Sequence, residues 1–325
     1  MTGPRKALIT GATGQDGWYL SQLLLADGYQ VFGLVHEADA TPVLDGVIAI
    51  IGDLADSMDI QSAIEYAQPD EVYNLGGVSS VGLSWQQPML TAEVTGLGFL
   101  RVINAVQALP GNRANQVRIV QASSAEIFGE AVGPQAESAA IAPITPYGAA
   151  KAFAHQLAHV YRSAGLSIST AIMYNHESPR RPETFVTRKI TRGVARIARG
   201  EADRLYIGNL GARRDWGFAG DYARALQLIG SHHVADDFVV ATGESHSVAD
   251  FVATAFRHIG VADWQALVEI DPQFERPVDP PEQRGDSAKI RKELGWTPSK
   301  SFEDLVAEMV DADLELLDAA QHTAT

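Results

Sequence analysis

Two short motifs hold side chains that could transfer protons. In "PYGAAK", Tyr147 and Lys151 lie four residues apart at a predicted helix start, so both face the same side. A tyrosine has a pKa near about 10, so accepting a proton at neutral pH requires a lowering of about three units, or about 4 kcal/mol. A neighbouring ammonium group and an oxidised nicotinamide ring would supply that lowering by stabilising the phenolate.

The second motif, "ASSAEIFGE", follows an apolar run, and its Ser124 precedes Tyr147 by 23 residues. We expect Ser124 to share a proton network with Tyr147 and to hold a substrate hydroxyl. Together with Lys151, these two residues suffice to remove hydride from a carbinol, as in an alcohol dehydrogenase or a sugar epimerase. Neither of those reactions needs Glu126.

Glu126 has a use if the ketone formed by oxidation reacts further. Once C4 of a hexose is a ketone, the C5 proton becomes acidic, and a base can remove it while the C6 hydroxyl leaves as water. One glutamate could perform both proton transfers. The alternative is that Glu126 is a solvated polar residue at the end of a strand.

A glycine loop near the N-terminus indicates a dinucleotide site. In "ALITGATGQDGWYL", Gly11, Gly14 and Gly17 are spaced three apart between a predicted strand and a predicted helix, where backbone N–H groups can approach a pyrophosphate. An ordinary tight turn is the alternative. The spacing is that of short-chain dehydrogenase/reductases. The predicted cofactor contacts of the loop are Gly11, Thr13, Gly14, Gln15, Asp16 and Gly17.

Further cofactor contacts are predicted after the next strands. Glu37 stands about twenty residues past the loop, where an acid would bind the adenosine ribose and repel a 2′-phosphate, which favours NAD over NADP. Asp53 would meet the adenine, and "LGGVS" would line the pyrophosphate and ribose. The predicted contacts in these segments are His36, Glu37, Asp53, Leu54, Leu75, Gly76, Gly77 and Ser79.

The elements that position these motifs alternate between strand and helix. Apolar strand-like runs separated by helical patterns predict an α/β fold, a Rossmann-type doubly wound parallel sheet with a smaller, mostly C-terminal substrate-binding lobe. "DFVVATG" is expected to return to the sheet. We expect residues 1–175, with a returning segment at about 215–245, to form the dinucleotide-binding domain, and residues 176–214 and 246–325 to form the sugar-nucleotide lobe.

Composition excludes several classes of function. The 325 residues include 46% hydrophobic and 20% charged residues, as in globular proteins, and no apolar run has the length of a membrane span. The N-terminus is unlike a signal peptide, so we expect a cytoplasmic protein without a membrane partner. The absence of cysteine excludes disulfides, thiol nucleophiles and Cys-ligated metals. No metal is predicted.

The charge distribution indicates an anionic ligand. The net charge is −15, which argues against nucleic-acid binding, but residues 180–214 hold ten basic and three acidic residues, so this segment carries +7 and the remainder −22. The four-four-three spacing of Arg188, Arg192, Arg196 and Arg199 predicts a solvated helix face. The better ligand candidates lie outside that stripe: Arg180, Arg181, Lys189 and Arg214.

At these motifs the chain resembles the GDP-mannose 4,6-dehydratases, an extended branch of the short-chain dehydrogenase/reductases. The resemblance covers nearly the whole chain. Its most specific segments are "NHESP", "FVTRKITR" and "RDWG". It implies conversion of GDP-mannose to GDP-4-keto-6-deoxymannose: hydride leaves C4, water is eliminated across C5–C6, and the hydride returns to C6.

The resemblance also implies roles for individual residues. The family's catalytic threonine falls on Ser124, and its glutamate, tyrosine and lysine fall on Glu126, Tyr147 and Lys151. His176 and Arg181 match cofactor contacts. Substrate-binding positions, several of them around the nucleotide diphosphate, fall on Asn175, Val186, Lys189, Gly208, Arg214 and Arg276.

The chain departs from the family pattern at several points. His36 and Glu37 replace the arginines that grip the 2′-phosphate of NADP, so the family implies NADP while these residues favour NAD. The loop "EADATPVLDG", which helps to build the family's tetramer, is several residues shorter. "RPVDPP" keeps Arg276 but alters its neighbours, and "LGGVS" replaces the common Leu-Ala-Ala-Gln-Ser.

Two other functions remain open at this point. A GDP-sugar 4-epimerase would use the same Ser-Tyr-Lys set with Glu126 in substrate binding, and a nucleotide-sensing protein would keep the fold without catalysis. The apolar faces of residues 92–109 and 146–165 predict the four-helix contact of a homodimer. A homotetramer is the alternative.

Overall fold

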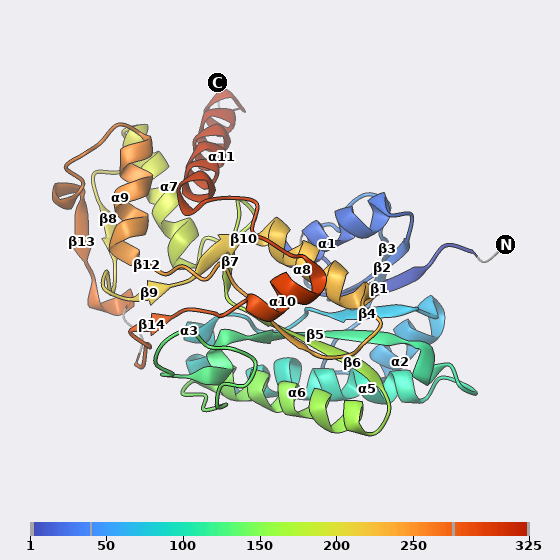
Figure 1. Cartoon of the computed structure of the whole chain (residues 1–325). Coiled ribbons are helices and arrows are strands. Elements are labelled where there is room, and N and C mark those ends of the chain that lie inside the picture. The colour runs from blue at the N-terminus through green and yellow to red at the C-terminus, as the bar shows by residue number, and fades with distance from the viewer. Residues whose placement is uncertain (1–2, 40, 275–276, 324–325) are drawn as a thin grey trace.

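A seven-stranded parallel sheet forms the centre of the larger part of the molecule (Figure 1). The computed structural model describes residues 3–39, 41–274 and 277–323. The strand order is β11-β6-β5-β4-β1-β2-β3, so the chain reverses its winding between β1 and β4. The strands are β1 (Lys6–Thr10), β2 (Gln30–Val35), β3 (Ile48–Ile51), β4 (Glu71–Asn74), β5 (Arg118–Ser124), β6 (Ser167–Met173) and β11 (Asp237–Val240). The doubly wound prediction is confirmed, including the return of "DFVVATG" as β11.

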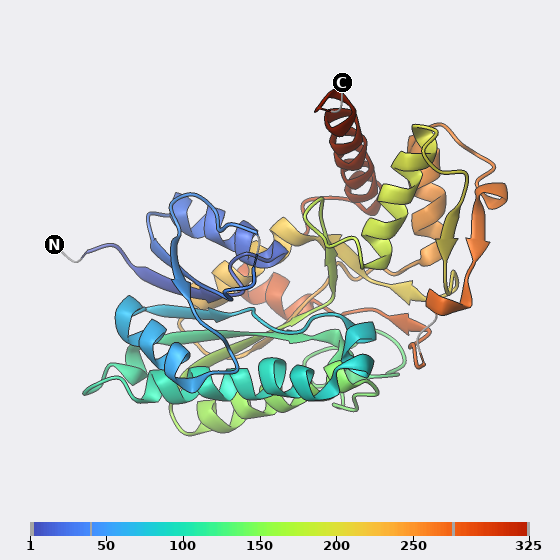
Figure 2. The same cartoon turned by 180° about the vertical axis from the view of Figure 1, so that it is seen from behind.

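Helices cover both faces of this sheet, which explains why its strands read as continuous apolar runs. Successive residues of β1 point to opposite faces: Ala7 and Ile9 enter one core cluster and Leu8 enters another. Figure 2 shows the same layers from behind. The first face carries α1 (Gln15–Ala26) and α8 (Ala219–Ser231), and the second carries α2 (Ser57–Ala67), α5 (Gly98–Gln107) and α6 (Pro146–Ser163).

Contrary to the expectation from the sequence, one helical stretch, residues 88–107, has the length and apolar content of a membrane span. It is built from α4 (Pro88–Thr91), a π-helical segment η1 (Ala92–Leu97) and α5. Half of it is buried within the protein, and Phe99, Val102 and Ile103 are almost fully enclosed in the second core cluster. Its buried apolar residues therefore belong to the core of the protein, whereas Met89, Leu90 and Leu97 are exposed.

A third core cluster lies in a smaller region, seen beside the sheet in Figure 1. Trp216, Phe251 and Phe302 form its aromatic centre, with Trp216 and Phe251 ring centroids 5.3 Å apart. Its helices are α7 (Val186–Ala198), α9 (Val248–His258) and α11 (Phe302–Thr323). Its short strands are β7 (Asn175–Glu177), β8 (Leu205–Ile207), β9 (Arg213–Arg214), β10 (Trp216–Phe218), β12 (His246–Ser247), β13 (Val268–Ile270) and β14 (Glu282–Gln283).

The remaining elements are short connections between these layers. They are the helices α3 (Val81–Gln86) and α10 (Ala288–Leu294) and the 3-10 turns η2 (Ala114–Gln116), η3 (Ala125–Phe128), η4 (Gln265–Leu267) and η5 (Pro272–Phe274). Ile290 of α10 and the nearby Trp296 pack in the core of the sheet's first face. The division of the chain into two domains at the expected boundaries stays a prediction.

The expected solvated face of α7 is wrong for its first arginine. Arg188 is buried, and its Nη2 lies 2.8 Å from Oδ1 of Asp313 on α11. Arg192 lies 3.8 Å from the same carboxylate, and Arg199 lies 2.6 Å from Asp318. The stripe faces an acidic partner helix more than a hundred residues away in the sequence, which the local spacing could not reveal.

Candidate active site

A cleft of about 1140 Å³ opens at the carboxyl ends of the sheet strands. It is lined by the residues that follow β1 and β4, by the last residues of β5 and by α6, together with α7 and segments of the smaller region. This is the position where doubly wound sheets bind ligands, next to the point where the strand order reverses.

The glycine loop is shaped for a close backbone approach. Gly11 has φ of +70°, and a Cβ atom there would lie 2.9 Å from the Cα of Gly76. A Cβ atom at Gly17 would lie 2.4 Å from the carbonyl oxygen of Gly11. Helix α1 starts just beyond, and its N-cap residue Gly14 provides no side-chain cap. The first-turn N–H groups are thus available to an anion at a helix N-terminus, so these residues fit the pyrophosphate of a dinucleotide.

The loop after β2 differs from the expectation. Glu37 is exposed and does not line the cleft, whereas Asp39 does. The Thr13 hydroxyl donates a hydrogen bond to Oδ2 of Asp39 at 3.0 Å, which ties this loop to the glycine loop. His36 lies 3.6 Å from Asp53, and both line the same end of the cleft. Sequence reasoning missed Asp39, although it is an acid in the same loop as Glu37.

Two predicted cofactor contacts, Asp16 and His176, bind each other. Their Oδ2 and Nε2 atoms are 2.9 Å apart, and Nδ1 of His176 lies 2.7 Å from the carbonyl oxygen of Tyr174. Burial disfavours both charged forms, but the mutual attraction and hydrogen bond outweigh it, so the pKa of Asp16 is lowered and that of His176 is raised. Gln15 donates to the carbonyl oxygen of His176 at 3.0 Å, so the start of α1 is fastened to β7.

Tyr147 occupies the first turn of α6. Thr145 is the N-cap, and its hydroxyl accepts a hydrogen bond from the Gly148 N–H at 2.9 Å. The Tyr147 N–H donates to the Ser84 hydroxyl at 3.2 Å. Burial raises the pKa of the Tyr147 hydroxyl to about 12, while its hydrogen bond with Ser124 acts in the opposite direction.

Lys151 lies one turn further along α6. Its Nζ donates to the carbonyl oxygen of Ala122 at 2.7 Å and lies 5.8 Å from the centre of the Tyr147 ring. Burial lowers the pKa of Lys151 to about 8. The side chains of Tyr147 and Lys151 face the same side of α6, as their spacing predicts. Without a bound cofactor, however, the pKa of Tyr147 is raised instead of lowered. The expected lowering therefore requires the second positive charge of the prediction, that of the oxidised nicotinamide ring.

Glu126 is buried and held at both carboxylate oxygens. The Ser124 hydroxyl caps the 3-10 turn η3 by accepting from the Glu126 N–H at 3.3 Å. Oε2 of Glu126 accepts from the Thr145 hydroxyl at 3.3 Å, and Oε1 accepts from the Gln283 side chain at 3.2 Å. Because the side chain is enclosed and lines the cleft, the alternative of a solvated strand-end residue is wrong.

The approach of Glu126 to Tyr147 depends on a glycine. A Cβ atom at Gly148 would lie 2.6 Å from the carbonyl oxygen of Glu126. A larger residue after Tyr147 would therefore push η3 away from α6.

Three basic residues from the cationic segment, Arg181, Lys189 and Arg214, line the cleft. Nζ of Lys189 has no hydrogen-bond partner among the described residues and lies 2.7 Å from the centre of the Phe274 ring. Burial lowers its pKa to about 8. Arg181 lies 3.2 Å from Glu177, and Arg214 donates to the carbonyl oxygen of Pro280 at 2.9 Å. A buried ammonium group with no hydrogen-bond partner in the described structure suits an anionic ligand such as a diphosphate.

Comparison with known proteins agrees with this geometry. The family model described as "GDP-mannose 4,6 dehydratase" matches residues 8–309. The chain belongs to the GDP-mannose 4,6-dehydratase family. The recognition made from the motifs is confirmed.

Relatives in this dehydratase family share 37–43% of their residues with the chain over nearly its full length. GDP-mannose 4,6 dehydratase 1 of Arabidopsis thaliana is 43% identical, with 96% of this chain and 91% of the relative covered. The human GDP-mannose 4,6 dehydratase is 39% identical, with 98% and 94% covered. That of Vibrio cholerae is 38% identical, with 96% and 94% covered.

Solved structures show the same fold. The UDP-glucose 4-epimerase of Thermus thermophilus, in complex with NAD, superposes with a TM-score of 0.82 at 27% identity, covering 94% of this chain and 98% of that one. The dTDP-glucose 4,6-dehydratase of Bacillus anthracis superposes with a TM-score of 0.82 at 16% identity, covering 97% and 98%. The second likeness bears on the fold alone.

The cleft of this dehydratase-family chain brings together nearly all predicted site residues. The exceptions are Glu37, which is outside it, and Arg276, which lies outside the described residues. Of the four ligand candidates, Arg180 is not among the lining residues and lies 4.4 Å over the Trp18 ring. Asn175, Val186 and Gly208 line the cleft as predicted. The individual roles of these residues stay predictions.

Sequence reasoning missed several residues of the cleft. Gln283 contacts Glu126 across 157 positions, and Phe274 covers Lys189 from the Pro-rich segment. Neither has a local pattern that could have revealed it. Thr145 did have a signal, since Thr-Pro at a predicted helix start is typical of an N-cap.

Proposed function

We propose that the protein is a sugar-nucleotide 4,6-dehydratase that converts GDP-mannose to its 4-keto-6-deoxy derivative. The observation that carries the proposal is the enclosed carboxylate of Glu126, held beside Tyr147 and Ser124 in the cleft. An epimerase or dehydrogenase needs no acid there, whereas elimination of water across C5–C6 needs a group that both accepts and donates a proton. Membership of the family supports the same reaction.

When bound, a nicotinamide cofactor would accept hydride from C4 and give it back at C6. The turn at Gly11 and the first turn of α1 would hold its pyrophosphate. Ser124 holds the C4 hydroxyl, and Tyr147 removes its proton as the phenolate. Lys151 favours that phenolate through its positive charge.

Elimination then uses Glu126. Its carboxylate removes the C5 proton, the C5–C6 double bond forms, and the C6–O bond breaks as the hydroxyl leaves. The protonated Glu126 gives its proton to that hydroxyl, so water is released and the carboxylate is regenerated. When the hydride returns to C6, Tyr147 gives the proton taken from the C4 hydroxyl to C5, which restores the phenolate. Its bonds to Thr145 and Gln283 hold it in place through both transfers.

The nucleotide diphosphate is assigned to the basic end of the cleft. Lys189 and Arg214 supply positive charge there, whereas Arg181 is proposed to contact the cofactor, as expected from the sequence. Arg276 is proposed for the same role from the sequence alone. Asn175 is proposed to help hold the diphosphate, and Val186 and Gly208 are proposed to contact the remainder of the nucleotide sugar.

For the cofactor we propose that NAD binds at least as well as NADP. Asp39 and Asp53 line the end of the cleft beside the loop after β2, and the described lining residues of that end include no lysine or arginine. A 2′-phosphate would therefore meet negative charge. Reconstitution of cofactor-stripped protein with each dinucleotide tests this, and an NADP preference of about tenfold or more contradicts it.

At the level of the whole chain we propose a cytoplasmic homodimer with the two-domain division expected from the sequence. The dimer would form through η1, α5 and α6. Apolar side chains of these elements, including Leu97, Phe153 and Val160, are exposed.

The deciding experiment is a product assay. Incubation with GDP-mannose is expected to give a product lighter by one water molecule, detected by mass spectrometry. A product of unchanged mass and altered stereochemistry would instead establish the 4-epimerase. Running the assay with several GDP- and other NDP-hexoses identifies the preferred substrate.

A further inference from the structure

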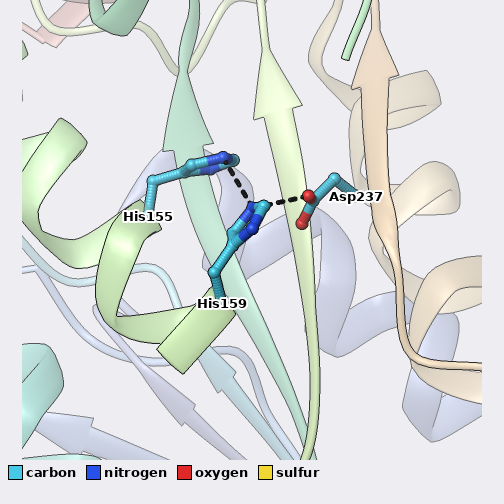
Figure 3. Close-up of side chains that lie close together, drawn as sticks. All are labelled: His155, His159 and Asp237. Carbon is cyan, nitrogen blue, oxygen red and sulfur yellow. Dashed lines mark hydrogen bonds and ion pairs between the residues drawn. The ribbon is translucent and has the colours of Figure 1, made fainter. Parts of the chain in front are cut away.

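A second group of polar side chains, outside the cleft, converges on one point (Figure 3). His155 and His159 lie one turn apart on α6, and Asp237 is the first residue of β11. The two Nε2 atoms are 3.2 Å apart, and Nε2 of His159 lies 2.7 Å from Oδ2 of Asp237. Figure 3 shows both rings and the carboxylate turned toward one another.

No placement of hydrogen atoms gives a separate hydrogen bond both between the two imidazoles and between His159 and Asp237. Nε2 of His159 carries either one hydrogen or one lone pair. With a hydrogen, it donates to Asp237, and His155 can only share that same hydrogen. With a lone pair, it faces a carboxylate oxygen at 2.7 Å with nothing between them. A cation bound by all three atoms removes this conflict.

The surrounding residues prepare the carboxylate for such a cation. Oδ1 of Asp237 accepts from Arg162 at 2.5 Å and from the Thr170 hydroxyl at 2.6 Å, which orients Oδ2 toward the histidines. Lys289 binds the neighbouring Asp236 at 2.6 Å, which leaves Asp237 as the carboxylate that faces the histidines.

We propose that His155, His159 and Asp237 form a binding site for a divalent transition-metal ion, with Zn²⁺ as the best match. Two imidazoles and a carboxylate suit Zn²⁺ and its neighbours better than Mg²⁺ or Ca²⁺. Ligands about 2.0–2.1 Å from a tetrahedral Zn²⁺ lie about 3.4 Å from one another, close to the 3.2 Å between the two Nε2 atoms. Oδ2 of Asp237, 2.7 Å from Nε2 of His159, would move slightly away from that ring when the ion binds. The half-exposed ring of His159 leaves a route from solvent and a fourth position for water.

The bound ion would link α6 to the edge strand β11. Helix α6 carries Tyr147 and Lys151 in its first two turns and the histidines in its later turns. The ion would therefore stabilise the helix that holds both residues without entering the cleft.

Titration calorimetry on the untagged, EDTA-treated full chain tests the proposal with Zn²⁺ as the probe. We expect one ion per chain, visible absorption typical of tetrahedral Co²⁺ when Co²⁺ replaces Zn²⁺, and a higher Tm with Zn²⁺ than with EDTA. His159→Gln is expected to weaken binding at least about tenfold. The matched control is His258→Gln, because His258 forms a comparable pair with Asp311 at 2.6 Å but belongs to no such group of three in the described structure.

Two results would overturn the site. One is the absence of binding by the wild-type chain at micromolar Zn²⁺, and the other is equal binding by the His159→Gln and wild-type chains. Circular dichroism of the His159→Gln chain separates loss of a ligand from loss of folding, since this ring is at the surface. The measurement needs neither substrate nor turnover, so it is independent of the proposed dehydratase activity.

Discussion

One hydroxyl serves both the fold and the chemistry of the cleft. The Thr145 hydroxyl, at the N-cap of α6, accepts a hydrogen bond from the Gly148 N–H and donates one to Oε2 of Glu126. The N-cap residue of α6, the helix that carries Tyr147, therefore also holds the carboxylate of Glu126 on the turn η3. The position of Tyr147 relative to Glu126 is therefore set where the N-terminus of α6 meets the turn η3.

Replacing Glu126 by glutamine separates oxidation from elimination. Because the amide neither removes the C5 proton nor protonates the leaving hydroxyl, we expect dehydration to fall by about 10²–10⁴-fold. Oxidation at C4 needs only Ser124, Tyr147 and Lys151, so bound cofactor should still be reduced. Product mass and the absorbance of reduced nicotinamide give the two readouts.

The matched control is Glu130→Gln, at an exposed position four residues further on, which should retain full activity. Wild-type dehydration rates in the Glu126→Gln chain would refute the assigned role.

Lys189 predicts how nucleotide binding depends on pH. Its pKa in the free protein is lowered to about 8, so below pH 8 the ammonium is already charged and affinity for GDP is at its maximum. A bound diphosphate raises the pKa of this group, so above pH 8 binding must take up a proton. We therefore expect affinity to fall as pH rises beyond 8, by up to about tenfold per unit.

Lys189→Arg serves as the comparison, because arginine stays charged throughout this range. Calorimetric GDP titrations should show a flatter profile for that variant between pH 7 and pH 9. Parallel profiles for the two chains would contradict the role of Lys189.

At the scale of elements, the strands and helices of the sheet could be predicted from the sequence because their apolar patterns are local. The central strands are buried on both faces, so they appear as apolar runs, and each expected strand of the sheet is present. Tyr147 and Lys151 came together because helical periodicity relates neighbours in the chain. Contacts such as Arg188–Asp313 and Gln283–Glu126 join residues more than a hundred positions apart, and no local pattern carries that information.

The buried pair between α7 and α11 predicts a large effect on stability. Arg188→Met leaves the fully buried Asp313 without its bidentate partner, so we expect the free energy of unfolding to fall by about 3–5 kcal/mol. Arg196→Met, on the same helix, removes an exposed pair with Glu201 and should cost less than about 1 kcal/mol. Urea unfolding followed by circular dichroism compares the two, and equal losses would show that burial of the pair is unimportant.

At the scale of the whole molecule, the cleft draws residues from both sides of the fold. The sheet contributes the glycine loop and the Ser124 turn, whereas the smaller region contributes Lys189, Arg214 and Phe274. The sequence located the sheet side well, because glycine spacing and strand ends are local signals. The Pro-rich wall of the cleft has no regular period, so its contacts follow only from the assembled chain.

The proposed dimer makes a prediction about association. Phe153 and Val160, on the side of α6 that faces away from the sheet, are 44% and 62% exposed. Exposed apolar side chains of this kind mark a surface that another subunit can bury. A Phe153→Glu/Val160→Glu double variant should sediment as a monomer where the wild-type chain sediments as a dimer, since burying these charges is costly. Val234→Glu changes an exposed apolar residue elsewhere and should remain dimeric. A monomeric wild-type chain at micromolar concentration would contradict the proposal.

Nearly every side of helix α6 makes a contact that the fold or the proposed function uses. Tyr147 and Lys151 face the cleft, Ala154 and Ala158 pack on the sheet, Phe153 and Val160 form the apolar surface, and His155 and His159 meet Asp237. For protein engineering this means that a randomised library over α6 should yield few active clones. Libraries aimed at the loops of the smaller region that line the cleft can vary substrate contacts while leaving this helix intact.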